Sequence, residues 1–143
     1  MPNQTMTRFG YPDTLIREYD HWVVLLREQQ VTLGSLILCS SSDATAFSKL
    51  PIGAFEDLGA AVNEIERSVA EAFQYDKINY LMLMMVDPNV HFHVFPRYAT
   101  ERSACGLTMS DAGWPAAPKL DAYRELDASE RDDLCRHIKS FWK

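Results

Sequence analysis

The spacing of apolar residues divides the chain into strand-like and helix-like segments. Two short aliphatic segments, Trp22–Leu26 and 33–39, are separated by a polar stretch and predict two antiparallel strands. From Pro51 onward apolar side chains recur at steps of three and four, which predicts one long amphipathic helix over Ile52–Phe73. The apolar positions of that helix are Phe55, Leu58, Val62, Ile65, Val69 and Phe73.

A nearly unbroken apolar run occupies residues 78–86 and is followed by turn-forming residues at 87–89. The run predicts a strand that is covered on both faces and lies at the centre of the sheet. The turn residues predict a tight hairpin to a second extended segment. In that segment a period of two places His91 and His93 on one face, with Asn89 just ahead of them.

The C-terminal part of the chain has a weaker pattern. Residues 99–126 mix Gly, Pro and Ser with isolated aromatics, so we expect an ordered loop. Ser129 is positioned to cap a last helix with an apolar stripe of Leu134, Ile138 and Phe141. The elements together predict an α+β fold, in which an antiparallel sheet of about five strands carries the long helix on one face and is followed by a C-terminal loop and helix.

The composition narrows the class of protein. A chain of 143 residues fits one domain, and 47% hydrophobic with 24% charged residues is typical of globular proteins. The net charge of −6 disfavours long nucleic acids as partners but leaves room for a local phosphate pocket. The three cysteines lack metal-type spacing. Without an apolar leader or a membrane-length segment, we expect a cytoplasmic protein that does not engage membranes.

The two histidines of the second extended segment are the main candidates for chemistry. Their backbones lie roughly 7 Å apart on a strand, close enough to engage one phosphate or one metal ion. An incidental, hydrogen-bonded pair is the alternative interpretation. A metal site needs further ligands, and no motif places them, so we expect no metal or other cofactor. His21 and His137 stand in charged surroundings, and we expect both at the surface.

Residues 87–98, with the sequence DPNVHFHVFPRY, resemble the signature of the histidine triad family. In that signature three histidines alternate with apolar residues and are often followed by Pro-Arg. The order of elements over residues 14–98 is also similar, whereas residues 99–143 form an extension outside the resemblance. The resemblance implies the histidine triad fold in a single domain and a homodimer with a continuous two-subunit sheet.

The resemblance also implies a function. It indicates a nucleotide hydrolase or nucleotidyl transferase that acts at the α-phosphorus of a nucleoside phosphate ester, anhydride or phosphoramidate. The middle histidine of the signature, here His91, would attack the phosphorus and form a covalent nucleotidyl-histidine intermediate. The third, His93, would contact the phosphate oxygens. The expected partner is therefore a small nucleotide.

Several positions depart from the family pattern. Asn89 occupies the place of the first histidine, where its amide either orients the neighbouring groups or simply completes the turn. Family members commonly have Gly-His where this chain has Gly34-Ser35, a further histidine near residues 40–43, and a late-strand asparagine where residues 83–85 are apolar. These departures leave open an alternative, a nucleotide-binding module with weak or no catalysis.

Two further residues are secondary candidates for substrate binding. Arg97 follows the signature strand and either reaches a phosphate through its forked guanidinium or is simply solvated. Asn79 resembles an asparagine often found in the preceding strand of the family, and a role in backbone pairing is the alternative.

Overall fold

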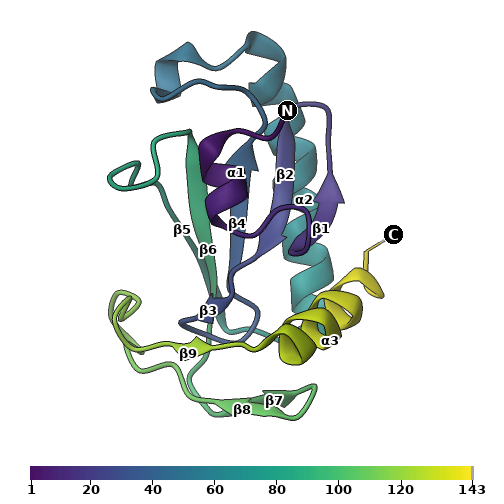
Figure 1. Cartoon of the computed structure of the whole chain (residues 1–143). Coiled ribbons are helices and arrows are strands. Elements are labelled where there is room, and N and C mark those ends of the chain that lie inside the picture. The colour runs from purple at the N-terminus through teal and green to yellow at the C-terminus, as the bar shows by residue number, and fades with distance from the viewer. Residues whose placement is uncertain (143) are drawn as a thin grey trace.

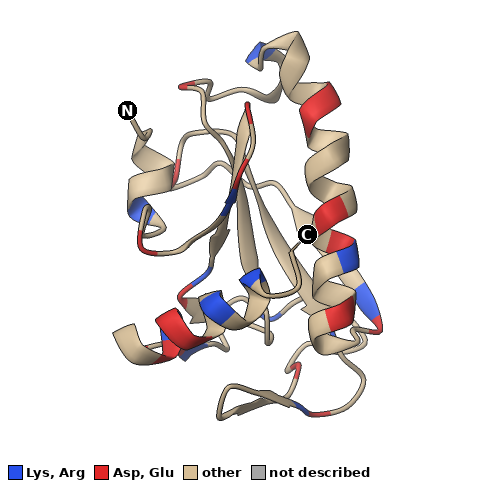
Figure 2. Cartoon of the chain, turned by 90° about the vertical axis from the view of Figure 1, so that its right-hand side faces the viewer, with Lys and Arg blue, Asp and Glu red and all other residues tan. Residues whose placement is uncertain are grey.

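The computed structural model describes residues 1–142 and has three layers. A five-stranded antiparallel sheet, in the order β1-β2-β4-β6-β5, lies between a short helix, α1, on one face and a long helix, α2, on the other (Figures 1 and 2). The α+β fold expected from the sequence is confirmed. The elements of these layers are β1 (Leu15–Glu18), β2 (Trp22–Leu26), β4 (Leu36–Ser40), β5 (Lys77–Leu81), β6 (His91–Arg97), α1 (Gln4–Arg8) and α2 (Ile52–Phe73).

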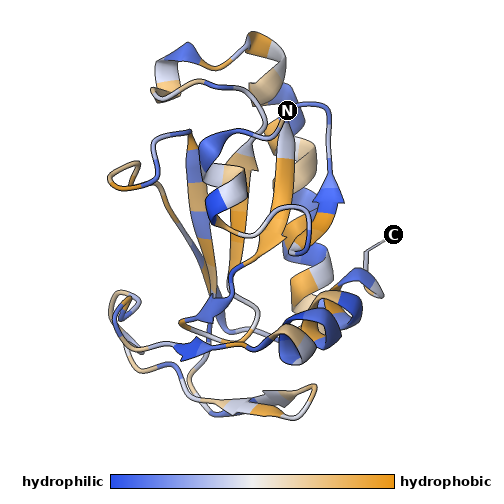
Figure 3. Ribbon diagram, viewed as in Figure 1, coloured by the Kyte–Doolittle hydropathy of each residue, from blue (hydrophilic) through white to orange (hydrophobic). Residues whose placement is uncertain are grey.

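The two central strands β2 and β4 are buried on both faces, which explains their continuous aliphatic sequence (Figure 3). Alternate residues of β2 enter two different apolar clusters. Trp22, Val24 and Leu26 belong to the large cluster with α2, and Val23 and Leu25 belong to a small cluster with α1. The side of the sheet that faces α1 is therefore defined by odd-numbered residues of β2.

The helix α2 begins and ends at the residues that the sequence pattern predicts. Its buried side chains form a line along one side of the helix and pack on the sheet. Phe55, which was expected to join this line, is 45% exposed, and two alanines join it instead. The buried residues of α2 are Ala54, Ala61, Ile65, Ser68, Val69 and Phe73.

The apolar run at 78–86 behaves differently from its prediction. Only β5, Lys77–Leu81, is a strand, and it lies at the edge of the sheet with partly buried side chains rather than at the centre. The chain leaves the ladder after Leu81, and Met84 has a positive φ of 23°, which is incompatible with extended backbone. The predicted tight hairpin is wrong, because a connection of residues 82–90 joins β5 to β6.

The C-terminal segment contains more regular secondary structure than the sequence predicts. It contains a hairpin of β7 (Arg102–Ala104) and β8 (Leu107–Met109), and a short strand β9 (Arg124–Glu125) that pairs with β3 (Gln29–Gln30). The last helix, α3 (Ala128–Lys139), is capped by a capping box of Asp127 and Glu130 instead of by Ser129. One 3-10 turn, Phe47–Lys49, precedes α2.

The apolar residues near α3 and the two histidines outside β6 differ in part from their predictions. Leu134 and Ile138 are buried as predicted, whereas Phe141 lies beyond the end of α3 and is half-buried. His21 and His137 are half-buried rather than fully at the surface. The ring of His137 lies between the rings of Phe73 and Phe141, 5.8 and 5.2 Å away. No helix within residues 1–142 is both long enough and apolar enough to cross a bilayer.

Candidate functional site at the histidine face of the sheet

The face of the sheet beneath α1 carries both histidines of β6. His91 lies opposite Cys39 and His93 opposite Ile37 in the register of β4 and β6. The two imidazole rings are 5.0 Å apart between centroids, and the residues are 2% and 8% exposed. The expected shared face of the two histidines is therefore confirmed, and the face is closed over by other side chains.

A hydrogen bond selects which nitrogen of the His91 ring carries the proton in the neutral form. Nδ1 lies 2.7 Å from the backbone carbonyl oxygen of Asn89. A carbonyl oxygen only accepts, so Nδ1 donates its proton, and in the neutral ring Nε2 carries the lone pair. This arrangement presents a nucleophilic nitrogen in a fixed orientation. The main chain of Asn89, rather than its amide side chain, provides this orientation.

The side chain of Asn89 ties the N-terminal segment to the start of β6. Its Oδ1 accepts from the backbone N–H of Thr5 at 3.1 Å, while the backbone N–H of Asn89 donates to Thr5 Oγ1 at 2.9 Å. Its Nδ2 donates to the carbonyl of Asp43 at 3.2 Å. The amide thus neither touches a histidine ring nor merely completes a turn. It holds α1 and the loop after β4 against the histidine strand.

Phe9, the residue after α1, lies over both histidines. Its ring centroid is 5.8 Å from that of His91 and 5.9 Å from that of His93. Next to it, Arg8 forms an ion pair of 3.5 Å with Asp87 from the connection between β5 and β6. The end of α1 therefore forms a roof over the pair of imidazoles.

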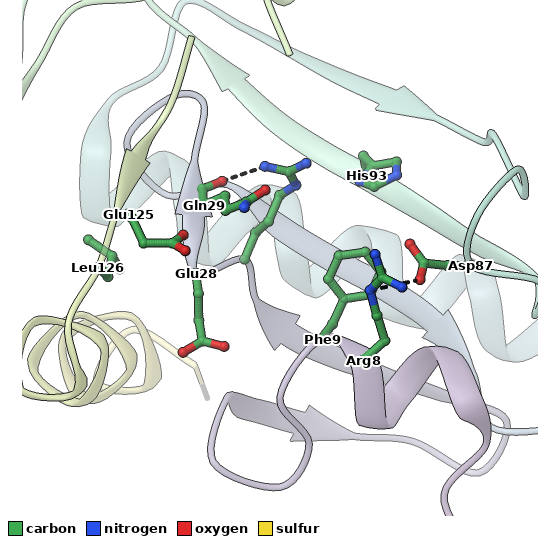
Figure 4. A pocket seen from close by; sticks show the side chains of 9 residues that line it. Arg8, Phe9, Glu28, Gln29, Asp87, His93, Glu125 and Leu126 are labelled. Carbon is green, nitrogen blue, oxygen red and sulfur yellow. Dashed lines mark hydrogen bonds and ion pairs between the residues drawn. The ribbon is translucent and has the colours of Figure 1, made fainter. Parts of the chain in front are cut away.

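A cavity of about 340 Å³ opens beside this roof and reaches His93 (Figure 4). His91 is not among the lining residues, whereas Phe9, whose ring lies 5.8 Å from that of His91, is one of them. The lining comes from segments that are distant in sequence, so the sequence pattern could not assemble it. The lining residues are Arg8, Phe9, Arg27, Glu28, Gln29, Asp87, His93, Glu125 and Leu126.

The environment of His93 keeps its ring neutral. Burial, followed by the nearby charges of Arg27 and His91, lowers the pKa of His93 to about 4. Its Nδ1 is buried and has no hydrogen-bond partner in the part of the chain that the structure describes. A neutral imidazole carries one N–H donor, and such a donor beside a cavity is suited to bind an acceptor of a ligand, such as a phosphate oxygen.

Cys39 is the other potential nucleophile on this face. It is fully buried in β4, opposite His91. Burial raises the pKa of its thiol to about 12. The thiol therefore stays protonated near neutral pH, and a protonated thiol is a poor nucleophile.

Arg97 and Asn79 lie together, away from the cavity at His93. Arg97 makes a two-pronged ion pair with Asp111, with distances of 2.7 Å from Nε and 3.0 Å from Nη2, and its Nη1 donates to Asn79 Oδ1 at 2.7 Å. Arg97 is 3% exposed. The pair therefore anchors the C-terminal segment to the sheet. Asp111 lies in a stretch without periodicity, so no sequence signal identified this partner.

The structure also bears on the alternative of a metal site. Within residues 1–142, no group of three or more His, Cys, Asp or Glu side chains is arranged to hold a metal ion. The rings of Phe9 and Phe95 lie beside His93 on this face.

Comparisons with known proteins identify the fold. No protein-family model matches the sequence, and no curated protein sequence matches it. Among solved structures, a histidine triad protein from Sinorhizobium meliloti is 18% identical with a TM-score of 0.75, covering 98% of this chain and 95% of its own. One from Marinobacter aquaeolei is 19% identical with a TM-score of 0.73, covering 95% and 93%.

A diadenosine triphosphate hydrolase from Plasmodium falciparum is 11% identical with a TM-score of 0.69, covering 91% of this chain and 76% of the hydrolase. At these identities the similarity concerns the fold. This chain has the fold of the histidine triad proteins over nearly its whole length.

Proposed function

We propose that this chain, with its histidine triad fold, is a nucleotide hydrolase or nucleotidyl transferase. It acts at the α-phosphorus of a nucleoside phosphate ester, anhydride or phosphoramidate. The observation that carries the proposal is the His91 ring, whose Nδ1 donates to the Asn89 carbonyl and whose Nε2 holds a lone pair beside neutral His93. A protein of similar fold is a diadenosine triphosphate hydrolase, which agrees with this class of substrate.

In the proposed reaction His91 is the nucleophile. Its Nε2 forms a bond to the α-phosphorus while the bond to the leaving group breaks, and the leaving group departs with the electron pair. A water molecule or another acceptor then displaces His91 from the nucleotidyl intermediate and restores the free imidazole. His93, as a neutral N–H donor, stabilises the negative charge that develops on the non-bridging oxygens.

One observation favours a second candidate, a nucleotide-binding module without useful catalysis. The cavity ends at His93, and Phe9 covers His91. Attack requires the phosphorus to lie about 3 to 3.5 Å from Nε2. In the catalytic proposal the ring of Phe9 must therefore rotate away when substrate binds, whereas in the module a phosphate stays at His93.

The replacement His91→Ala separates the two candidates. We expect turnover of adenosine phosphoramidates or dinucleoside polyphosphates to fall by about three orders of magnitude or more, because the covalent route is lost. The dissociation constant for the nucleotide should stay within about threefold, because His93 and the cavity remain. His21→Ala, a change on a half-buried histidine outside this face, is the matched control for both measurements.

Chemical trapping gives an independent measurement. After brief incubation of the wild-type protein with an α-labelled nucleotide, the enzyme proposal expects an acid-labile label on His91. Binding of nucleotide without any label, together with equal background turnover in His91→Ala, would establish the module and remove His91 from the mechanism. Failure of every nucleotide to bind would reject both candidates.

A further inference from the structure

Arg27 lies on the histidine face of the sheet, although it follows the end of β2. Val23 and Leu25 point to this face, and the backbone N–H of Arg27 continues the pairing with a 3.0 Å hydrogen bond to the carbonyl of Ser35. The period of two therefore directs the Arg27 side chain to the same side. The residue is a wall of the cavity that reaches His93.

Its side chain extends across the sheet towards the histidines. The guanidinium carbon lies 5.7 Å from the ring centroid of Phe95, and the Phe95 ring stacks on the His93 ring at 6.0 Å with an interplanar angle of 4°. Arg27, Phe95 and His93 thus form a continuous row beside the cavity. The charge of Arg27 is one of the causes that lower the pKa of His93, which is consistent with this proximity.

The guanidinium of Arg27 forms no ion pair with a carboxylate in the part of the chain that the structure describes. Its Nη1 donates to the carbonyl of Gln29 at 2.5 Å, and its Nε is buried without a hydrogen-bond partner. Three carboxylates line the cavity: Asp87 is paired with Arg8 and Glu28 with Arg131, while Glu125, like Asp87, acts on Arg27 only through its charge, without an ion pair. These charges compensate the half-buried guanidinium only in part, and a bound anion in direct contact would relieve the remaining cost.

We infer that Arg27 binds a second anionic group of the substrate, a phosphate or a carboxylate, while the α-phosphate lies at His93. The inference rests on the proposed function and narrows its substrate class to nucleotides that carry at least two anionic groups. With Nη1 held by Gln29 and Nε buried, Nη2 remains as a charge-assisted donor to an oxygen of a carboxylate or phosphate.

Three adenosine compounds that cannot be cleaved at the α-phosphorus test this inference on the wild-type protein. Adenosine 5′-methylphosphonate carries one anionic group, α,β-methylene-ADP adds a phosphonate, and adenosine 5′-(carboxymethyl)phosphonate adds a carboxylate. Isothermal titration should show that at least one of the two larger compounds binds about 10- to 100-fold more tightly than the first, as expected for a charge-assisted hydrogen-bonded pair. The compound that gains affinity identifies the group as phosphate or carboxylate.

The variant Arg27→Met keeps an unbranched side chain as far as the position of Nε and removes the charged guanidinium. We expect it to abolish the preference for the second anionic group while changing the affinity for adenosine 5′-methylphosphonate by no more than about twofold. Arg17→Met, the same change at an exposed arginine of β1, should leave the preference intact. Thermal denaturation of both variants establishes that they are folded.

The outcomes separate this inference from the proposed function. If the compounds bind and the wild-type protein shows no preference, or if the preference survives in Arg27→Met, the role of Arg27 is overturned and the nucleotide function stands. If none of the three compounds binds, both are overturned. Turnover in His91→Ala is measured separately and does not depend on Arg27.

Discussion

His91 and His93 are adjacent on one strand, yet their surroundings give them different chemistry. The hydrogen bond from His91 Nδ1 to the Asn89 carbonyl selects the ring nitrogen that can attack. His93 has no such bond at its own buried Nδ1, and burial keeps it uncharged. The division of roles that we propose, one nucleophile and one neutral donor, therefore rests on the neighbours of each ring as well as on its position in the motif.

The neutral state of His93 should appear in the pH dependence of stability. Its folded pKa of about 4 lies below the ordinary value of 6.5, so the unfolded chain takes up the proton first as the pH falls. The contribution of neutral His93 to the free energy of unfolding is therefore fully present above pH 6.5. It is lost as the pH falls from 6.5 to about 4, and below that the free energy of unfolding no longer changes through this residue. The loss between pH 7 and pH 5 is about 2 kcal/mol.

Urea unfolding at pH 7 and pH 5 measures this effect when wild type is compared with His93→Gln, which cannot titrate. The wild-type protein should lose about 2 kcal/mol more of its free energy of unfolding than the variant over this interval. An equal loss in both proteins would mean that His93 does not titrate with a depressed pKa in the folded state.

At the scale of elements, α1 is held by side chains rather than by its own helical stability. A helix of five residues is far too short to persist alone. Asn3 caps it and also donates to the carbonyls of Ser40 and Ser42, and Thr5 exchanges two hydrogen bonds with Asn89. These bonds place Phe9 over the histidines, so a small polar element controls access to the site.

The replacement Asn89→Ala should loosen this element. It removes the side-chain partners of the Thr5 N–H and of the Asp43 carbonyl, and we expect a loss of about 2 kcal/mol in the free energy of unfolding. Hydrogen exchange of the α1 amides should quicken by at least about tenfold, while exchange in α2 changes only by the global loss. Asn63→Ala, at an exposed asparagine of α2, is the control. Unchanged hydrogen exchange of the α1 amides in Asn89→Ala would contradict the role of Asn89 in holding α1.

The helix α2 and the strand β2 were predicted with correct bounds, for different reasons. The helix buries side chains at the helical period, whereas β2 is a short, continuous aliphatic run with polar residues on both sides. The run at 78–86 misled the prediction, because an unbroken apolar run does not distinguish a central strand from an edge strand followed by an exposed loop. The helix α1 shows no period at all, since polar bonds to distant residues hold it.

The candidate site also has one part that the sequence predicts and one part that it does not. The histidine pair follows from alternation along one strand, which a sequence displays directly. The cavity beside it combines the end of α1, the link after β2, the connection before β6 and the strand β9. The sequence analysis did not identify Arg27, although its position two residues after Leu25 predicts that its side chain points to the same face of the sheet. Its importance follows only from its neighbours Phe95 and His93 in space.

At the scale of the whole molecule, the sheet ends in two edges, β1 and β5. An edge strand carries main-chain groups without partners in the sheet, and natural proteins cover or pair such edges. Apolar side chains lie exposed directly after β5, with exposed fractions of 43% for Leu83, 85% for Met85 and 69% for Val86. We propose that a second copy of the chain pairs along this edge and covers these side chains.

Light scattering coupled to size-exclusion chromatography tests the proposed homodimer. The wild-type protein should have twice the mass of one 16.3 kDa chain, and the double variant Leu83→Glu with Met85→Glu should have the mass of one chain, because two carboxylates would be buried at the interface. Ile52→Glu changes an equally exposed apolar residue at the start of α2, 84% exposed and distant in sequence from β5, and should remain dimeric. A wild-type protein with the mass of one chain at micromolar concentration would refute the dimer. A double variant that stays dimeric would place the interface on another surface.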